Sequence, residues 1–217
     1  MKPGGVVSLK KFNSFVFLRK NRLYLFMCLA FIIGIFISSA LVINSGNALS
    51  FASKLAAFYI KDRQGVGFFP LLIRVFFRYF AVCLAFFIFG ASVIGVVLSP
   101  IICCAAGLYF GSIVSFIYSV FSIKGVAFNA IVLIPASLVF SVCMFFAAKE
   151  SFSFSLILLK LTFPKSRPVN VSAEFKSYCG RFLIFFVVLI IVSLIDSAVS
   201  VSFLKLFDFQ LLGGAYV

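Results

Sequence analysis

Apolar residues gather into long runs that are separated by shorter polar segments. The first run, from Leu23 to Ile43, continues for 21 residues without a charged side chain. An α-helix rises about 1.5 Å per residue, so a run of this length crosses the roughly 30 Å hydrocarbon core of a bilayer. Five such runs are predicted to span a membrane, at residues 23–43, 79–98, 101–123, 126–148 and 182–203.

Proline and glycine mark the breaks between the central runs. Ser99-Pro100 separates the second run from the third, and proline is favoured at the first position of a helix. Lys124-Gly125 marks the next turn. Pro135 falls inside the fourth run, where neighbouring helices can satisfy the carbonyl that it leaves free. The pattern predicts an all-α fold, a polytopic membrane helical bundle that forms one domain over residues 1–217.

Two polar connectors interrupt this pattern, at residues 44–78 and 149–181. Within the first connector, Phe51–Ile60 and Phe68–Phe77 are rich in aromatic residues and flanked by basic ones. Each is expected to form a short amphipathic helix, either lying in the membrane interface or packed on the bundle. The sequence leaves both alternatives open and predicts one or two such helices besides the five spans.

Composition excludes a soluble protein. Hydrophobic residues make up 64% of the chain and charged residues 11%, whereas soluble domains have about 45–50% and about 25%. There is no histidine, and the six cysteines form no C-x-x-C pair, so neither a zinc site nor a disulfide framework is predicted. Nucleotide-binding and hydrolase motifs are also missing. We therefore expect a protein that is not an enzyme and that binds no cofactor or metal.

The charge of the chain is strongly basic, with 19 Lys and Arg against 5 Asp and Glu. These basic residues lie between the apolar runs, so they are expected to set topology and contact anionic membrane lipid rather than nucleic acid. A cytoplasmic N-terminus places twelve of them inside and seven outside. This asymmetry favours a cytoplasmic N-terminus and an extracytoplasmic C-terminus, with residues 44–78 outside and 149–181 in the cytoplasm.

A cleaved signal peptide is the competing interpretation of the first run. Ser38, Ser39 and Ala40 would supply small residues at a cleavage site. The apolar regions of signal peptides are about 7–15 residues long. Because the run from Leu23 to Ile43 is longer, a membrane span is favoured.

The third run carries small residues at every fourth position, and these share one helical face. They are Cys103, Gly107, Gly111, Ser115 and Ser119. Small residues let two helix backbones approach closely in lipid, so this face is expected to be a helix-packing face, which Gly90 and Gly95 extend. It would receive either another helix of the same chain or a partner protein.

Two polar side chains, Asn129 and Asp196, fall inside predicted spans. A charge at the centre of a bilayer costs about 2.5–3.5 kcal/mol on insertion scales, so an acid there is a functional candidate. Asp196 would serve as an ion or proton site, or pair with a cation on a partner helix. The alternative is that it lies near enough to the outer interface to stay hydrated.

Several motifs together resemble a known family. In chain order they are Gly34-Ile35-Phe36-Ile37-Ser38-Ser39, Gly90-Ala91-Ser92-Val93-Ile94-Gly95, Gly107-Leu108-Tyr109-Phe110-Gly111-Ser112 and Ile134-Pro135. With the basic N-terminus, the chain length and the five-span layout, they resemble the stage II sporulation protein M family of spore-forming Firmicutes and their relatives.

This resemblance implies a function in the bacterial cell membrane. Family members are non-catalytic scaffolds that hold peptidoglycan-degrading partners at the septal membrane during engulfment. On this basis the expected partners are extracytoplasmic cell-wall hydrolases, contacted through Lys54, Lys61 and Arg63 of the outer connector. Distant relatives are encoded beside ABC-type ATPases, so the alternative is the membrane component of a transporter that works with a separate ATPase.

Overall fold

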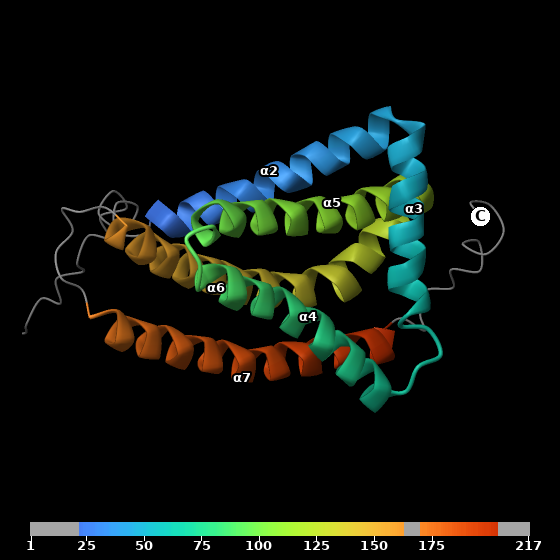
Figure 1. Ribbon diagram of the computed structural model, residues 1–217. Coiled ribbons are helices and arrows are strands. Elements are labelled where there is room, and N and C mark those ends of the chain that lie inside the picture. The colour runs from blue at the N-terminus through green and yellow to red at the C-terminus, as the bar shows by residue number, and fades with distance from the viewer. Residues whose placement is uncertain (1–21, 163–169, 204–217) are drawn as a thin grey trace, which may run out of the picture.

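The computed structural model describes residues 22–162 and 170–203, and over these ranges the chain is helical, with no β-strand. The predicted all-α membrane bundle is confirmed. Figure 1 shows the helices in order along the chain: α2 (Arg22–Asn44), α3 (Gly46–Lys61), α4 (Phe68–Gly90), α5 (Gly95–Phe128), a π-helix η1 (Asn129–Leu133), α6 (Ile134–Leu161) and α7 (Val171–Phe203).

Helices α2, α4, α5, α6 and α7 run along the length of the bundle, and α3 lies across one end (Figure 1). Four stretches are long and apolar enough to cross a membrane: residues 22–44, 68–90, 95–161 and 171–203. The third has 67 residues, which is far more than the roughly 20 that one crossing needs. It reverses direction at Ser122, whose φ of 47° and ψ of −120° interrupt the helix. The molecule is therefore a multi-pass helical membrane protein.

The second membrane-long helix differs from its prediction. Helix α4 is continuous from Phe68 to Gly90, so the expected separate amphipathic helix at Phe68–Phe77 is wrong. The chain turns at residues 91–94, between two glycines, and Pro100 lies inside α5 rather than at its start. Arginines within 68–78 suggested a connector, but they do not end α4, because a nearby carboxylate pairs with them, as described below.

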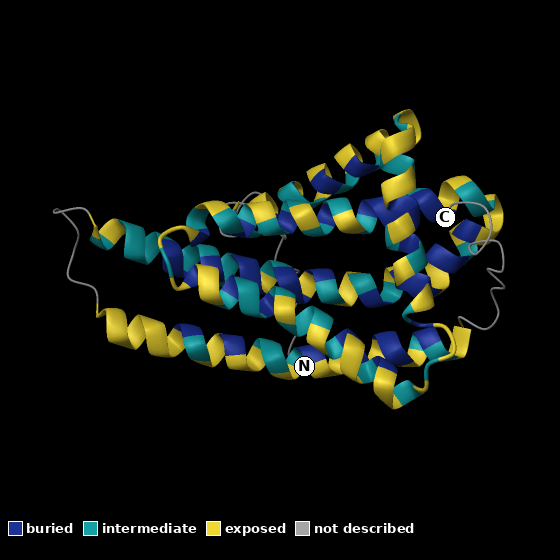
Figure 2. Cartoon of the chain, turned by 45° about the vertical axis from the view of Figure 1, so that its right-hand side comes forward, coloured by how far each residue is buried: buried dark blue, intermediate teal, exposed yellow. Residues whose placement is uncertain are grey.

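Helix α3 includes the predicted amphipathic segment Phe51–Ile60 and packs on the bundle, which is one of its two expected placements. One face, with Ala52, Ala56 and Ile60, is buried against the end of the bundle. The opposite face is exposed and carries Phe51, Lys54, Phe58 and Lys61. Figure 2 shows this division as dark and light stripes along the helix that crosses the bundle end.

The second connector is shorter than predicted, because the flanking helices continue into it. Helix α6 extends to Leu161 and α7 begins at Val171, so the expected break at residues 149–181 narrows to 162–170. Some predictions fall on residues 1–21, 163–169 and 204–217, which lie outside the described residues; these include most of the basic N-terminal segment.

The apolar core has two parts. One lies at the α3 end and contains Phe116, Phe128 and Val132, and the other fills the body of the bundle around Phe86 and Phe182. The outer surface is also apolar: many large side chains, such as Phe36 at 71% exposure and Ile123 at 85%, point away from the bundle. A surface of this kind is stable in lipid rather than in water.

Candidate functional site

The predicted small-residue face of α5 packs against α2 of the same chain. A Cβ added at Gly111 would lie 2.9 Å from the Cα of Ile35, and one added at Gly107 would collide with the carbonyl of Phe31. Ser115 donates a hydrogen bond to Ser39 at 2.8 Å. Of the alternatives left open by the sequence, the structure therefore places another helix of the chain here.

The two ends of this face differ. Cys103 is fully buried, whereas Ser119 is exposed and donates only to the carbonyl of Ser115 in its own helix. A further pair, Ser38 and Ser112, shares a hydrogen bond of 2.6 Å across the same contact. The close contact between α2 and α5 thus runs from Cys103 to Ser115.

Gly90 and Gly95 do not extend this face. They flank the turn between α4 and α5, where α6 and α7 cover them. Ser155 of α6 donates to the carbonyl of Gly90 at 2.9 Å, and a Cβ at Gly95 would collide with the Ser155 hydroxyl. Tyr178 of α7 donates to the carbonyl of Phe87 at 2.8 Å. These glycines let polar side chains reach the end of α4.

Asn129 is buried at the first position of the π-helix. Its Nδ2 donates to the carbonyl of Val114 at 3.2 Å, which links the returning chain to α5. Its Oδ1 has no hydrogen-bond partner among the described residues. This hydrogen bond stabilises the reversal of the chain after α5.

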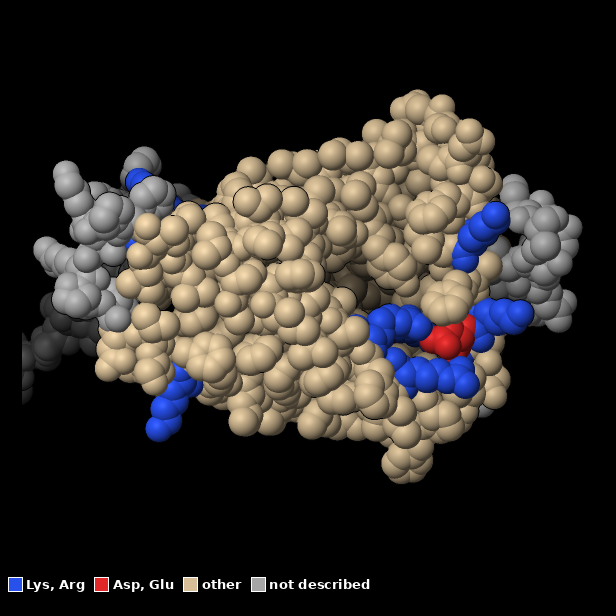
Figure 3. All heavy atoms as spheres, in the orientation of Figure 1, with Lys and Arg blue, Asp and Glu red and all other residues tan. Residues whose placement is uncertain are grey.

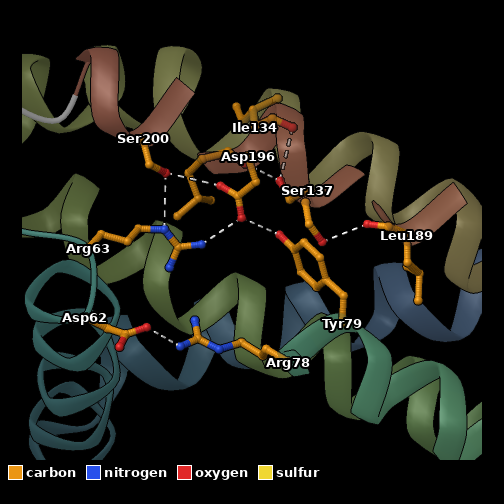
Figure 4. Close-up of polar contacts among 11 residues, drawn as sticks. Asp62, Arg63, Arg78, Tyr79, Ile134, Ser137, Leu189, Asp196 and Ser200 are labelled. Carbon is orange, nitrogen blue, oxygen red and sulfur yellow. Dashed lines mark hydrogen bonds and ion pairs between the residues drawn. The ribbon is translucent and has the colours of Figure 1, made fainter. Parts of the chain in front are cut away.

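The most elaborate polar cluster joins Arg63 to Asp196 (Figure 4). Arg63 lies two residues beyond the end of α3, and Asp196 lies on α7 about two turns before its described end. Arg63 Nη2 donates to Asp196 Oδ2 at 2.8 Å. Both residues are buried, at 4% and 0% exposure. The pair therefore fixes the end of α3 to α7 inside the protein.

Two hydroxyl groups complete the coordination of the Asp196 carboxylate. Tyr79 of α4 donates to Oδ2 at 2.7 Å, and Ser200 donates to Oδ1 at 3.2 Å. Ser200 also accepts a hydrogen bond from Arg63 Nε at 3.3 Å. Arg63 and Tyr79, from the segment after α3 and from α4, thus reach a carboxylate on α7 that lies more than 110 positions later in the chain.

The surroundings of Arg63 keep its side chain charged. Its guanidinium lies 3.7 Å from the centre of the Tyr59 ring, a cation–π distance. Burial by itself lowers the pKa of Arg63, but the Tyr59 phenol and the Asp196 carboxylate raise it by more, so the net pKa lies above the ordinary arginine value. Arg63 is therefore a permanent cation.

A second, more exposed group of charges adjoins this pair. Asp62 accepts from Arg78 at 2.6 Å and lies 3.4 Å from Arg74. This carboxylate pairs with both arginines in the first half of α4, which helps α4 to continue through them. Figure 3 shows basic and acidic side chains gathered on this face of the molecule.

One donor of Arg63 is left over. Its Nη1 is buried and has no hydrogen-bond partner among the described residues. A buried donor without a partner costs about 1–3 kcal/mol, and more when it is charged. The cluster is thus stabilised on one side and unsatisfied on the other.

The three residues predicted to contact a partner differ in their exposure. Lys54 and Lys61 are exposed on α3, but Arg63 is buried and faces Asp196, so the prediction that Arg63 meets a partner at the surface is wrong. Asp196 was expected to form an ion or proton site, to pair with a partner helix, or to stay hydrated near the interface; in the structure it is buried and paired with Arg63 of the same chain. A buried acid needs a cation, and that rule was the signal available in the sequence.

Among the described residues, no group of three or more His, Cys, Asp or Glu side chains could hold a metal ion. Comparisons with protein-family models, with curated proteins and with solved structures found no match to this chain.

Proposed function

We propose that the protein is a non-catalytic scaffold of the bacterial cell membrane that holds extracytoplasmic cell-wall hydrolases, as its resemblance to the sporulation engulfment protein implies. The observation that carries the proposal is the fixed position of α3. A helix that lies across the end of the bundle and is tied to α7 by a buried ion pair offers partners a surface of constant shape.

The exposed face of α3 has side chains suited to an acidic partner. Lys54 and Lys61 are two turns apart on one face, and Phe51 and Phe58 are each 61% exposed between and beside them. Aromatic residues are enriched at protein-binding surfaces, and aromatic residues together with lysine are typical of helices at the membrane interface. On the proposed topology this face lies outside the cytoplasm, where wall hydrolases act.

A matched pair of double variants tests the scaffold. Lys54→Ser with Lys61→Ser removes two charges from α3, and Lys160→Ser with Lys176→Ser removes two from exposed positions at the other end of the bundle. We expect only the α3 variant to lose recovery of a wall hydrolase after photo-crosslinking from position 58 in intact cells. Equal recovery from both variants, with normal wall remodelling, would refute the proposal.

A transporter component is the second candidate, and the buried Arg63–Asp196 cluster is the observation that favours it. Ionisable groups inside membrane proteins commonly mark ion or substrate pathways. Transporter sites lie near the bilayer midplane, whereas this cluster adjoins α3 at one end of the bundle. The scaffold is therefore preferred. Solute uptake by proteoliposomes that contain the chain with an ABC-type ATPase would reverse this preference.

A further inference from the structure

A hollow of about 90 Å³ lies beside the Arg63–Asp196 cluster, between α4, α5 and α6. Figure 3 shows it as a depression next to the gathered basic and acidic side chains. Most of its wall is apolar and includes Val75, Ala106, Ile113, Phe140 and Met144. Arg63 and Arg78 also line it, so the hollow has a cationic edge and an apolar interior.

The two arginines at this edge are each paired with a carboxylate, Arg63 with Asp196 and Arg78 with Asp62. A third arginine, Arg74, also pairs with Asp62 but does not line the hollow. Both carboxylates are already engaged by arginines. Arg63 Nη1 remains buried without a partner. One buried cationic donor at the edge of the hollow is thus available to a bound anion.

The cationic edge and the apolar walls together indicate the chemistry of the ligand. An inorganic anion would satisfy the donor but leave its other oxygens against aromatic and aliphatic walls, where they lose hydration. A neutral alkyl chain would suit the walls but leave the guanidinium unpaired. We propose that the hollow binds an amphiphilic anion, a carboxylate or phosphate head on an alkyl chain, with the head at Arg63 and Arg78.

The size of the hollow limits how much of the ligand it encloses. An engineered cavity of about 150 Å³ holds one benzene molecule, and a single water needs about 10–15 Å³. A hollow of about 90 Å³ therefore encloses little more than the head. Because it opens on the outer surface of the bundle, the rest of the chain lies along the protein in the surrounding lipid. The binding site does not depend on the scaffold role.

Equilibrium binding to the delipidated full-length protein in dodecyl maltoside tests the ligand class. Four probes separate head from tail: dodecanoate, phosphatidylglycerol, dodecanol and inorganic phosphate. We expect dodecanoate or phosphatidylglycerol to bind at least tenfold more tightly than dodecanol and inorganic phosphate, and the tighter of the two identifies a fatty acid or a phospholipid as the source. Equal binding of dodecanol or of inorganic phosphate, or no binding of any probe, would overturn the proposal.

Neighbouring alanines of α5 give a matched test of the site. Ala106 lines the hollow, whereas Ala105 is exposed on the outer surface. Ala106→Leu should weaken binding of the acidic probe at least tenfold, and Ala105→Leu should leave it unchanged. Arg63→Lys keeps a charge beside Asp196 but removes the second guanidinium arm, so it should weaken acid binding without changing dodecanol binding. Equal affinities for the two alanine variants would place the ligand elsewhere and refute the site.

Discussion

The guanidinium of Arg63 lies 2.8 Å from the carboxylate of Asp196, although 133 positions separate the two residues in the sequence. Arg63 follows the helix that crosses the bundle end, and Asp196 belongs to the last membrane-long helix. The pair therefore connects the early and late parts of the chain at one end of the bundle.

Removing one partner of this pair should destabilise the protein strongly. Asp196→Ala leaves Arg63 buried and uncompensated, and breaking a buried ion pair in this way costs about 3–5 kcal/mol. Arg63→Leu combined with Asp196→Leu removes both charges and should restore most of that loss. Unfolding free energies in mixed micelles would measure the coupling.

The outer ion pair supplies the control. Arg74 has a side chain that is 53% exposed and lies 3.4 Å from Asp62. Such pairs contribute about 0–1 kcal/mol, so Arg74→Ala should change stability little. A loss as large as that of Asp196→Ala would mean that burial is not what distinguishes the two pairs.

The contact between α2 and α5 should not tolerate a larger residue. Gly111→Leu would place a side chain where the backbone of Ile35 already lies, and overpacking of this kind costs about 1–3 kcal/mol or more. We expect a lower yield of folded protein and a lower melting temperature. Gly180→Leu is the matched change, since a Cβ there meets no atom within 4 Å, and its yield should equal that of the unmodified chain.

The reversal between α5 and α6 is a strained position for serine. Ser122 has φ 47°, a region that glycine adopts without the steric conflict of a Cβ. Ser122→Gly should therefore stabilise the protein by about 0.5–1 kcal/mol, and Ser122→Val should destabilise it by at least as much. If this conformation is present, thermal unfolding should show a higher melting temperature for Ser122→Gly and a lower one for Ser122→Val. Shifts of the melting temperature in the same direction would contradict it.

The hydroxyl of Tyr178 should contribute separately from its ring. It donates to the carbonyl of Phe87 near the C-terminus of α4, an oxygen that also accepts from the backbone N–H of Ala91. Tyr178→Phe keeps the stacking on Phe154 and should cost about 1 kcal/mol. The same change at Tyr118, which is 60% exposed, should cost nothing measurable in a parallel unfolding experiment.

The proposed orientation can be measured with two new cysteines in a chain that lacks its native ones. Lys54→Cys is expected outside and Asn170→Cys in the cytoplasm, because twelve basic residues fall on the side of the N-terminus and seven on the other. A membrane-impermeant maleimide should label position 54 in intact cells and position 170 only after lysis. The reverse pattern would invert the topology.

Hydropathy alone predicted the ends of a helix where the apolar run and the helix have the same length. The predicted span Leu23–Ile43 became α2, Arg22–Asn44, because the lipid-facing apolar run itself determines the length. The start of α4 could not be predicted in this way. Arg74 and Arg78 indicated a polar connector, because the sequence does not show that Asp62, on another segment, pairs with both of them.

The candidate site was less accessible to sequence alone. Asp196 was recognised because an acid in an apolar run is costly. Its partner could not be predicted, because it depends on where the residues that follow α3 lie in the fold. Lys61 and Arg63 are two residues apart, and only the second turns inward to the carboxylate. To distinguish them, one must know which face of α3 packs on the bundle, and the local sequence pattern does not determine this.

The serine contacts between α2 and α5 have a consequence for how the protein is made. The hydrogen bond between Ser38 and Ser112 cannot form until Ser112, 74 residues later in the chain, has been synthesised. At typical synthesis rates of about 5–20 residues per second, that delay is roughly 4–15 s. During this time α2 is in the membrane with its small, polar face turned to lipid or to the insertion machinery. The first helix thus depends for its final environment on a helix that has not yet been translated.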